Sequence, residues 1–241
     1  MPTLKALIFD VDGTLSDTER DGHRVAFNQA FKDESLNWHW DIETYGELLE
    51  VTGGKERIRH FIENYQPALD IPPDLDSFIL NLHKIKTRHF VTLLKSGAIP
   101  LRPGVERLLD EARAEGLRLA IATTTTPENI TALLTATLGE SSIGWFDVIA
   151  AGDVVANKKP APDIYLYALQ HMGLNATDCI AFEDSENGLM SSLGAGLKTI
   201  VTTNAYTRQQ NFDGAIVVLE QLGEPGSETC VDVVLIKQLF K

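Results

Sequence analysis

The second part of the chain alternates short apolar runs with longer segments in which apolar residues recur at helical spacing. Runs typical of buried strands occupy residues 117–122, 146–150 and 178–182. A similar run at residues 4–9 ends in two acids and a glycine. Strands that are separated by helices predict parallel βαβ units. The predicted fold class is therefore α/β, with a Rossmann-like parallel sheet as its core.

Between residues 16 and 97 the pattern is helical. Ala26, Phe27, Ala30 and Phe31 share one helical face, and further helical signals follow later in this region. No convincing strand pattern appears there. We therefore expect an all-helical cap domain at residues 16–97, inserted after the first strand, and a core domain made of residues 1–15 and 98–241.

The last part of the chain is less clearly patterned. Residues 198–202 and 215–219 predict two further strands, which we place at the edges of the sheet. Residues 230–241 are compatible with a strand or with a helix, and the pattern does not separate the two. Earlier in the core, Thr126 precedes Pro127, which is typical of a helix that begins with a threonine N-cap and a proline.

Composition and charge narrow the classes of function. The 241 residues carry a formal net charge of -13, which argues against nucleic acid or an anionic membrane as a partner, because both require a basic surface. No apolar stretch reaches the length that crosses a bilayer, and no leader precedes the first strand. Cys179 and Cys230 lack C-x-x-C spacing, which fits a reducing compartment. We expect a soluble, cytoplasmic monomer with a small-molecule partner.

Asp10 and Asp12 follow the first predicted strand, at the edge of an α/β sheet where chemistry collects. Alternate residues of an extended chain point the same way, so both carboxylates can enter one crevice. One of the two carboxylates could act as a nucleophile and the other as a proton donor. A bound cation would reduce the repulsion between the two carboxylates. The alternative is an Asp-Gly turn that only ends a strand.

Polar residues follow two later strands as well. Thr123 and Thr124 present hydroxyls which, with backbone N–H groups, can bind phosphate oxygens. Lys158 and Lys159 lie on a loop that two prolines stiffen, so a lysine there is suited to act as a fixed charge. For Lys158, an ordinary surface position is the alternative.

Acids also follow the strand at residues 178–182, in the form of Glu183 and Asp184. None of the six histidines forms an H-E-x-x-H motif or a zinc-type cluster, which argues against structural zinc. The expected metal is therefore a hard cation on oxygen ligands.

Two places in the helical region carry candidate binding residues. Free N–H groups at the start of a helix, beside a glycine pair and two cations, can bind an anion such as phosphate. An acid and a histidine four residues apart lie on one helical face. These residues are Gly53, Gly54, Lys55 and Arg57 in the first case, and Glu19 and His23 in the second. The alternatives are a solvated loop and a solvated helical pair.

Four strand ends in order thus carry Asp-x-Asp, Thr, Lys and Glu-Asp, and in this the chain resembles the haloacid dehalogenase-like hydrolases. The matching segments are Asp10-Val11-Asp12-Gly13-Thr14, Thr123, Lys159-Pro160 and Glu183-Asp184. The resemblance implies that Asp10 is the nucleophile that forms an aspartyl phosphate and that Asp12 is the acid/base. It implies that Thr123 and Lys159 hold phosphate oxygens. Mg²⁺ would bind to Asp10, Asp184 and the backbone carbonyl of Asp12, and to Glu183 either directly or through water.

The cap resembles, more narrowly, the CbbY group, whose members are phosphatases of xylulose-1,5-bisphosphate. The segments that carry this likeness are Glu43-Thr44-Tyr45-Gly46-Glu47-Leu48-Leu49, Thr52-Gly53-Gly54-Lys55-Glu56-Arg57-Ile58 and Tyr206-Thr207-Arg208. The likeness implies a substrate site made of Glu19, His23, Tyr45, Gly53, Gly54, Lys55, Arg57 and Thr124. Some members space the first acid and histidine of the cap as E-x-x-H, whereas here three residues separate Glu19 from His23.

Two other functions remain open at this point. A β-phosphoglucomutase-like enzyme resembles this chain in core, nucleophile and cap, but returns the phosphoryl group to a reoriented intermediate. A non-catalytic relative is more distant, because such relatives commonly lose a motif acid and this chain keeps all of them. The resemblance therefore implies a Mg²⁺-dependent phosphatase of a sugar phosphate, working through an aspartyl phosphate.

Overall fold

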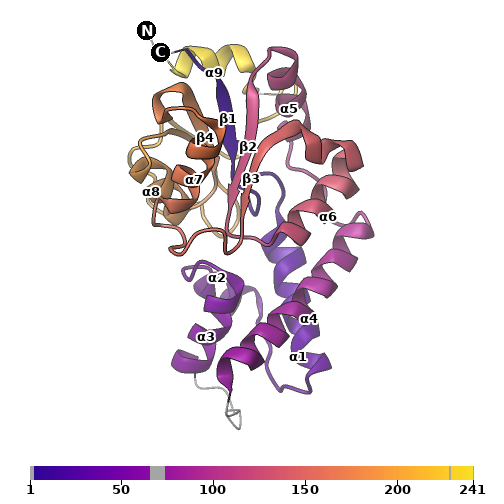
Figure 1. Cartoon of the computed structure of the whole chain (residues 1–241). Coiled ribbons are helices and arrows are strands. Elements are labelled where there is room, and N and C mark those ends of the chain that lie inside the picture. The colour runs from indigo at the N-terminus through magenta and orange to yellow at the C-terminus, as the bar shows by residue number, and fades with distance from the viewer. Residues whose placement is uncertain (1–2, 66–73, 228, 241) are drawn as a thin grey trace.

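One sheet of six parallel strands forms the centre of the α/β part, in the order β3-β2-β1-β4-β5-β6. The computed structural model describes residues 3–65, 74–227 and 229–240 (Figure 1). The strands are Ala6–Phe9 (β1), Arg118–Thr123 (β2), Phe146–Ala151 (β3), Cys179–Glu183 (β4), Lys198–Thr202 (β5) and Val217–Leu219 (β6). The predicted α/β class with a Rossmann-like parallel sheet is confirmed.

Helices cover both faces of this sheet and form the region between β1 and β2 (Figure 1). The α-helices are Arg24–Asp33 (α1), Ile42–Leu48 (α2), Gly54–Tyr65 (α3), Leu75–Lys95 (α4), Val105–Ala114 (α5), Pro127–Leu138 (α6), Asp163–Met172 (α7), Glu186–Gly194 (α8) and Val233–Phe240 (α9). A π-helical turn, Glu19–His23 (η1), precedes α1, and two 3-10 turns are Glu140–Trp145 (η2) and Ala176–Asp178 (η3).

Successive side chains of the central strands point to opposite faces of the sheet. In β1, Leu7 and Phe9 belong to one buried cluster, together with residues of α5, α6 and α9. Ala6 and Ile8 belong to another, together with residues of α7. Because both faces are buried, the strands are continuous apolar runs, and this explains why the sequence pattern predicts them.

Two sequence predictions about the last elements are resolved by the sheet. The prediction that residues 198–202 form an edge strand is wrong, because β5 lies between β4 and β6. Within the described chain, Val233–Phe240 is a helix rather than a strand, and it buries Val233, Ile236 and Phe240. These three residues recur at helical spacing, so the helix covers the sheet with a single apolar face.

Thr126 has extended backbone at the start of α6, and Pro127 is the first helical residue. The predicted helix start is therefore confirmed. The hydroxyl of Thr126 makes no capping hydrogen bond, however, so the proline and the backbone rather than the side chain define this terminus.

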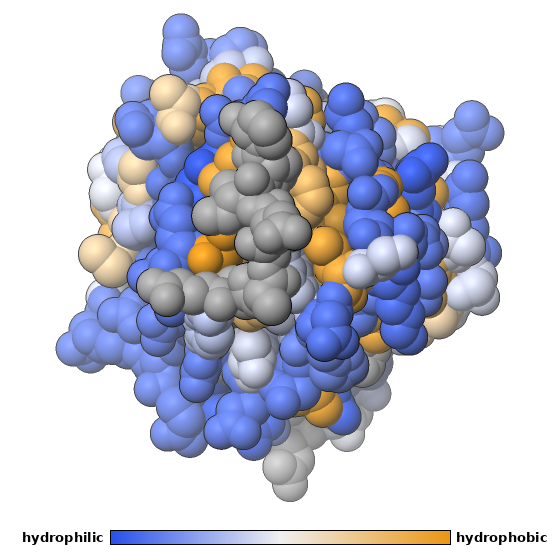
Figure 2. Space-filling model, turned by 90° about the horizontal axis from the view of Figure 1, so that it is seen from below, coloured by the Kyte–Doolittle hydropathy of each residue, from blue (hydrophilic) through white to orange (hydrophobic). Residues whose placement is uncertain are grey.

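Helices α1 to α4 lie below the sheet in Figure 1, and the described residues between Thr18 and Ser96 contain no strand. Aromatic side chains fill the centre of this group, with Phe27, Trp40 and Tyr45 fully buried. Seen from below, the surface is mostly hydrophilic around the rim, with hydrophobic groups nearer the middle (Figure 2). The helical region thus has a buried core of its own.

The chain leaves the sheet for these helices and returns from them at one place. Ser16 forms an isolated β-bridge with Leu101, and its hydroxyl donates to the carbonyl of Pro100 at 2.5 Å. The backbone N–H of Arg102 donates to the carbonyl of Leu15 at 2.9 Å. The domain boundaries at 15/16 and 97/98 stay a prediction. Among the helices that the structure describes, none is both long and apolar enough to span a membrane.

Candidate active site

Polar residues end three neighbouring strands at one edge of the sheet. β1 pairs with β2 on one side and with β4 on the other. Asp10 directly follows β1, while Thr123 and Glu183 are the last residues of β2 and β4. Because parallel strands end at the same edge, these side chains meet, and together they line a cleft of about 90 Å³.

Lys159 brings a positive charge to these acids. Its ammonium donates to Asp10 Oδ1 at 2.6 Å and to Glu183 Oε1 at 2.7 Å, and the residue is only 6% exposed. Burial disfavours the charged form, but the two carboxylates outweigh it and hold the pKa of Lys159 above its usual value. The hydroxyl of Tyr165 donates to the same oxygen of Glu183. Lys159 is therefore a fixed cation beside Asp10.

The acids at this edge are too many for one lysine. One oxygen from each of Asp10, Glu183 and Asp184 lies within 4.8 Å of the others. Burial, and then the neighbouring carboxylates, raise the pKa of Asp184 well above its usual value. Burial raises the pKa of Asp10 from 3.8 to about 7, against the opposing charge of Lys159. A second cation bound beside these three carboxylates would therefore stabilise their ionised forms.

The donor set fits a hard divalent cation. All three side chains offer oxygen, and Glu183 Oε2 is buried without a hydrogen-bond partner. The backbone approaches closely: a Cβ on Gly13, whose φ is +89°, would lie 2.1 Å from Asp184 Oδ2. The carboxylate of Asp184 thus lies against backbone that only glycine can supply, and the three acids together could hold a divalent cation.

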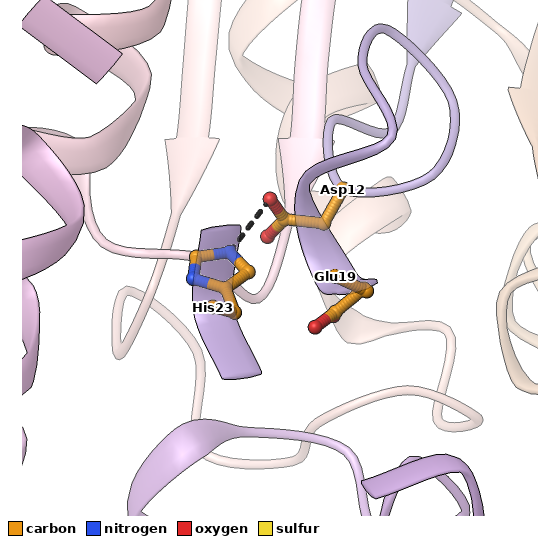
Figure 3. A group of neighbouring side chains, drawn as sticks. All are labelled: Asp12, Glu19 and His23. Atoms are coloured by element: carbon orange, nitrogen blue, oxygen red, sulfur yellow. Dashed lines mark hydrogen bonds and ion pairs between the residues drawn. The ribbon is translucent and has the colours of Figure 1, made fainter. Parts of the chain in front are cut away.

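Asp12 has different partners, because its side chain reaches toward the helical region. Thr18 Oγ1 donates to Asp12 Oδ1 at 2.5 Å, and His23 Nε2 lies 2.8 Å from the same oxygen (Figure 3). Burial raises the pKa of Asp12, but His23 and Thr18 outweigh it and the net shift is downward. The π-helical turn η1 presents both Glu19 and His23 toward Asp12 (Figure 3).

Lys86 extends this contact into α4. Its ammonium, 3% exposed, donates to His23 Nδ1 at 2.6 Å, so the ring hydrogen of His23 lies on Nε2 and is donated to Asp12. The imidazole stacks on Phe90 with ring centroids 3.8 Å apart, which fixes its orientation. Burial lowers the pKa of Lys86 to about 8, although Asp12 opposes this.

We expect the rate to depend on the charge of Lys86. The lysine is charged below its pKa of about 8, so activity should be present below that pH and should decline as the pH rises through it. Lys86→Met keeps the length of the side chain but donates nothing to His23, and should lower kcat about ten- to a hundredfold at neutral pH. The pH profiles of kcat/KM and of kcat, measured for both proteins by phosphate release, check the two effects.

Lys84 offers the matched control, because it is an exposed lysine on the same helix. Lys84→Met should keep both the rate and the alkaline limb. If Lys86→Met retained the wild-type rate and the same alkaline limb, the contact with His23 would have no part in the reaction.

The second group of predicted cap residues converges on Arg57. Its Nη1 donates to the hydroxyl of Tyr45 at 2.9 Å and its Nε to the carbonyl of Leu48 at 3.0 Å. The Tyr45 hydroxyl donates to Glu19 Oε2 at 2.5 Å, and that oxygen lies 4.0 Å from Arg57. Arg57 is 7% exposed and remains a cation at the edge of the cleft.

Most of the residues predicted from the sequence line one cleft. These are Asp10, Asp12, Glu19, Gly53, Arg57, Thr123, Thr124, Lys159, Glu183 and Asp184. His23 and Tyr45 lie behind it and contact its lining through Asp12 and Arg57. Their roles in catalysis and binding stay predictions.

Gly54 and Lys55 are not among the residues that line this cleft. They line a different cavity of about 770 Å³, also between the helical region and the sheet domain. Lys55 forms an ion pair across that cavity with Asp153, which also accepts from Lys158 at 2.6 Å. A Cβ on Gly54 would lie 2.6 Å from His83 Nε2, so this glycine makes room for a neighbouring side chain.

Several residues that contact the predicted ones were not themselves predicted. Thr18 and Lys86 set the environment of Asp12, and Tyr165 contacts Glu183. Asn204 donates to Asp184 Oδ2 at 2.6 Å. One sequence signal was present: Lys86 lies on the apolar face of α4, between Leu82 and Phe90, and a lysine in that place is rarely buried without a partner.

Comparison with known proteins shows the family of the chain. The family model for haloacid dehalogenase-like hydrolases matches residues 4–196. The CbbY protein of Rhodobacter capsulatus is 52% identical over 212 residues, covering 88% of this chain and 91% of the relative. A phosphorylated carbohydrates phosphatase of Thermotoga maritima is 31% identical over 199 residues, covering 82% and 84%.

A solved structure is also similar over nearly the whole length. It is the D10N mutant of CbbY from Rhodobacter sphaeroides in complex with xylulose-1,5-bisphosphate, with a TM-score of 0.87 and 44% identity. The match covers 96% of this chain and 100% of that one. The family model spans most of the described core and the helical region. The chain therefore belongs to the haloacid dehalogenase-like hydrolase family and, like the Thermotoga maritima relative, is a phosphatase.

Proposed function

We propose that this phosphatase requires Mg²⁺, forms an aspartyl phosphate on Asp10 and acts on a sugar bisphosphate, with xylulose-1,5-bisphosphate as the best candidate. The observation that carries the proposal is the contrast between two carboxylates in one cleft. Asp10 contacts Lys159, whereas Asp12 contacts His23. Two acids in such different environments are suited to different steps. The xylulose-1,5-bisphosphate bound in the CbbY complex supports the choice of sugar.

The reaction has two halves. An oxygen of Asp10 attacks the phosphorus, the bond from phosphorus to the sugar oxygen breaks, and Asp12 donates a proton to that oxygen. Asp12 then takes a proton from water, whose oxygen attacks the aspartyl phosphate and releases phosphate and the carboxylate of Asp10. The Thr123 hydroxyl and the Lys159 ammonium stabilise the phosphoryl oxygens in both halves.

Asp12 must carry a proton in the first half. Its pKa is lowered in the unliganded cleft by His23 and Thr18, despite burial. A phosphate dianion beside it would raise that pKa again, because like charges disfavour ionisation. Substrate binding thus prepares Asp12 as an acid, and once its proton has passed to the sugar oxygen the same carboxylate can act as the base.

Mg²⁺ would be held by Asp10, the backbone carbonyl of Asp12, Glu183 and Asp184. The buried, unpartnered Glu183 Oε2 supports this assignment. When bound, the ion supplies positive charge beside the transferred phosphoryl group. The same charge would keep Asp10 ionised, although burial, with the neighbouring carboxylates and against Lys159, raises its pKa to about 7 in the absence of the ion.

The second phosphate of the substrate would bind to Arg57. The cleft of about 90 Å³ is small beside ordinary ligand pockets of about 300–1,000 Å³, so the helical region must move away to admit a sugar bisphosphate. Arg57 lines the cleft from that region and presents charged N–H donors. We assign this role to Arg57 rather than to Lys55, because Lys55 pairs with Asp153 in another cavity.

A panel of sugar monophosphates and bisphosphates tests the function. Both inorganic phosphate and isomerised sugar phosphate are measured for each substrate. We expect one phosphate released for each bisphosphate consumed, and kcat/KM higher for the bisphosphate than for its monophosphates. Accumulation of an isomerised sugar phosphate without phosphate release would instead identify a mutase.

Arg57→Ala should lower kcat/KM for xylulose-1,5-bisphosphate by about ten- to a thousandfold, because one charge-assisted partner of the remote phosphate is lost. A small aryl phosphate has no second anion, so its hydrolysis should hardly change. Steady-state kinetics on the two substrates check the difference between them.

Arg59→Ala is the matched control, since Arg59 is a half-exposed arginine two positions along the same helix that pairs with Asp76. It should leave both substrates unaffected, as should Lys55→Ala to within a few fold. Equal losses on both substrates in Arg57→Ala would mean that Arg57 supports the fold of the helical region and does not read the substrate.

A further inference from the structure

Arg102 lies where the chain returns from the helical region, three residues before α5, and it is 8% exposed. Its Nη1 donates to the carbonyl of Gly13 and, at 2.9 Å, to the carbonyl of Thr202. Its Nε lies 3.3 Å from Asp17 Oδ1. One guanidinium therefore joins the loop that carries Asp12 to the end of β5.

The other end of the fork reaches two more strand ends. Nη2 donates to the carbonyls of Thr203 and Glu220, each at 2.6 Å. Thr203 follows β5 and Glu220 follows β6, so both carbonyls lie beyond the last pairing of their strands. The two Nη atoms thus donate to four backbone carbonyls, a planar geometry that a lysine could not reproduce.

Two of the carbonyls that Arg102 contacts, those of Gly13 and Thr203, lie next to residues of the proposed metal site. Gly13 follows Asp12, whose carbonyl is one proposed ligand, and a Cβ on Gly13 would lie 2.1 Å from Asp184 Oδ2. Thr203 precedes Asn204, whose amide donates to the same oxygen of Asp184 at 2.6 Å. Arg102 thus holds the backbone on two sides of the Asp184 carboxylate.

We propose that Arg102 is a positioning residue for the metal site: by holding the carbonyls of Gly13 and Thr203 it sets the distance between the carbonyl of Asp12 and the carboxylate of Asp184. The inference rests on the Mg²⁺ site of the proposed function. It goes beyond that function, because Arg102 lies outside the four motifs and contacts neither the nucleophile nor the acid/base. Residues that orient metal ligands in this way typically change metal affinity about ten- to a hundredfold when replaced.

The test compares Arg102→Lys with Arg107→Lys. Arg107 is a matched control because it also donates to backbone carbonyls, those of Gly223 at 2.8 Å and Val231 at 3.2 Å, but those carbonyls do not lead to the metal site. Mg²⁺ affinity is measured directly by titration calorimetry, and independently as the Mg²⁺ concentration that gives half-maximal turnover. We expect Arg102→Lys to bind Mg²⁺ about ten- to a hundredfold more weakly. We expect Arg107→Lys to bind it as the wild type does, even if both variants melt earlier.

Excess Mg²⁺ should restore most of kcat in Arg102→Lys, because the ligands themselves remain. An Arg102→Lys protein that melts earlier yet binds Mg²⁺ with wild-type affinity would overturn the inference and leave Arg102 as a structural residue. A wild type that binds no Mg²⁺ and works in a chelator would overturn the proposed function instead.

If Arg102→Lys does not fold, the inference can be tested on the wild-type protein. In a Mg²⁺ titration followed by NMR, the Nε–H resonance of Arg102 should shift as the site fills, while that of Arg107 stays in place. A resonance of Arg102 that does not respond to saturating Mg²⁺ would contradict the inference.

Discussion

Asp10→Asn should lower phosphate release by at least about a thousandfold while the protein stays folded. The amide is a poor nucleophile and a poor metal ligand, and the exchange is nearly isosteric, so it opens no cavity beside β1. Lys159 keeps Glu183 as a partner at 2.7 Å, so its charge is not left alone. Phosphate release and the melting temperature of the same preparation check the two parts of this result.

Asp110→Asn controls for the change of charge, because Asp110 lies on α5 and pairs with Arg113, at 3.2 Å, on the surface. It should turn over as the wild type does. Substantial turnover by a folded Asp10→Asn protein would rule out the aspartyl phosphate. The covalent step can also be followed directly, because wild type quenched during turnover should carry phosphate on Asp10 and the variant should not.

Removal of divalent cations should stop activity, again by at least about a thousandfold, and Mg²⁺ should restore it. Ca²⁺ should restore it poorly, because its longer bonds and looser geometry misplace the attacking oxygen of Asp10. The measurement is turnover after dialysis against a chelator and readdition of each ion. A chelator already saturated with Mg²⁺ serves as the control, and full activity in free chelator would exclude the metal site.

Metal binding should also show in stability, with a definite dependence on pH. The pKa of Asp10 is raised from 3.8 to about 7 in the metal-free fold, mainly by burial, so the stability linked to its protonation is complete below about 3.8. That stability is lost as the pH rises through about 7. Mg²⁺ binds the ionised carboxylates, and so it should raise the melting temperature more at pH 8 than at pH 5. An equal rise at both values would mean that the ion binds elsewhere.

The core of the site is readable in the sequence because its pieces are local. Asp10, Thr123 and Glu183 each end a short apolar run, and an apolar run of that length in an alternating pattern is a buried parallel strand. The carboxyl ends of parallel strands share one edge, so three strand ends in a linear sequence already predict one site. The place of β5 in the strand order could not be predicted in this way, because an apolar strand has the same sequence pattern in the middle of a sheet as near its edge.

The helical part of the site depended on geometry that spacing along the chain does not reveal. Lys55 and Arg57 are two residues apart and are both basic. Successive positions of an α-helix are rotated by about 100° around its axis, so the two side chains lie on nearly opposite sides of the helix. One therefore lines the cleft of Asp10 and the other a separate cavity with Asp153.

The sequence by itself determined the α/β class, the helical insertion and the strand-end acids, because each follows from periodicity or from the residues next to a strand. Only the tertiary structure decided which charges act together. Lys86 reaches His23 across 63 positions, and Arg102 reaches Glu220 across 118, because packing of distant elements buries both cations beside acceptors that no local pattern marks. Burying a charged group without a hydrogen-bonding partner is costly, so a buried lysine or arginine is expected to have such a partner. Which residue that partner is becomes known only from the fold.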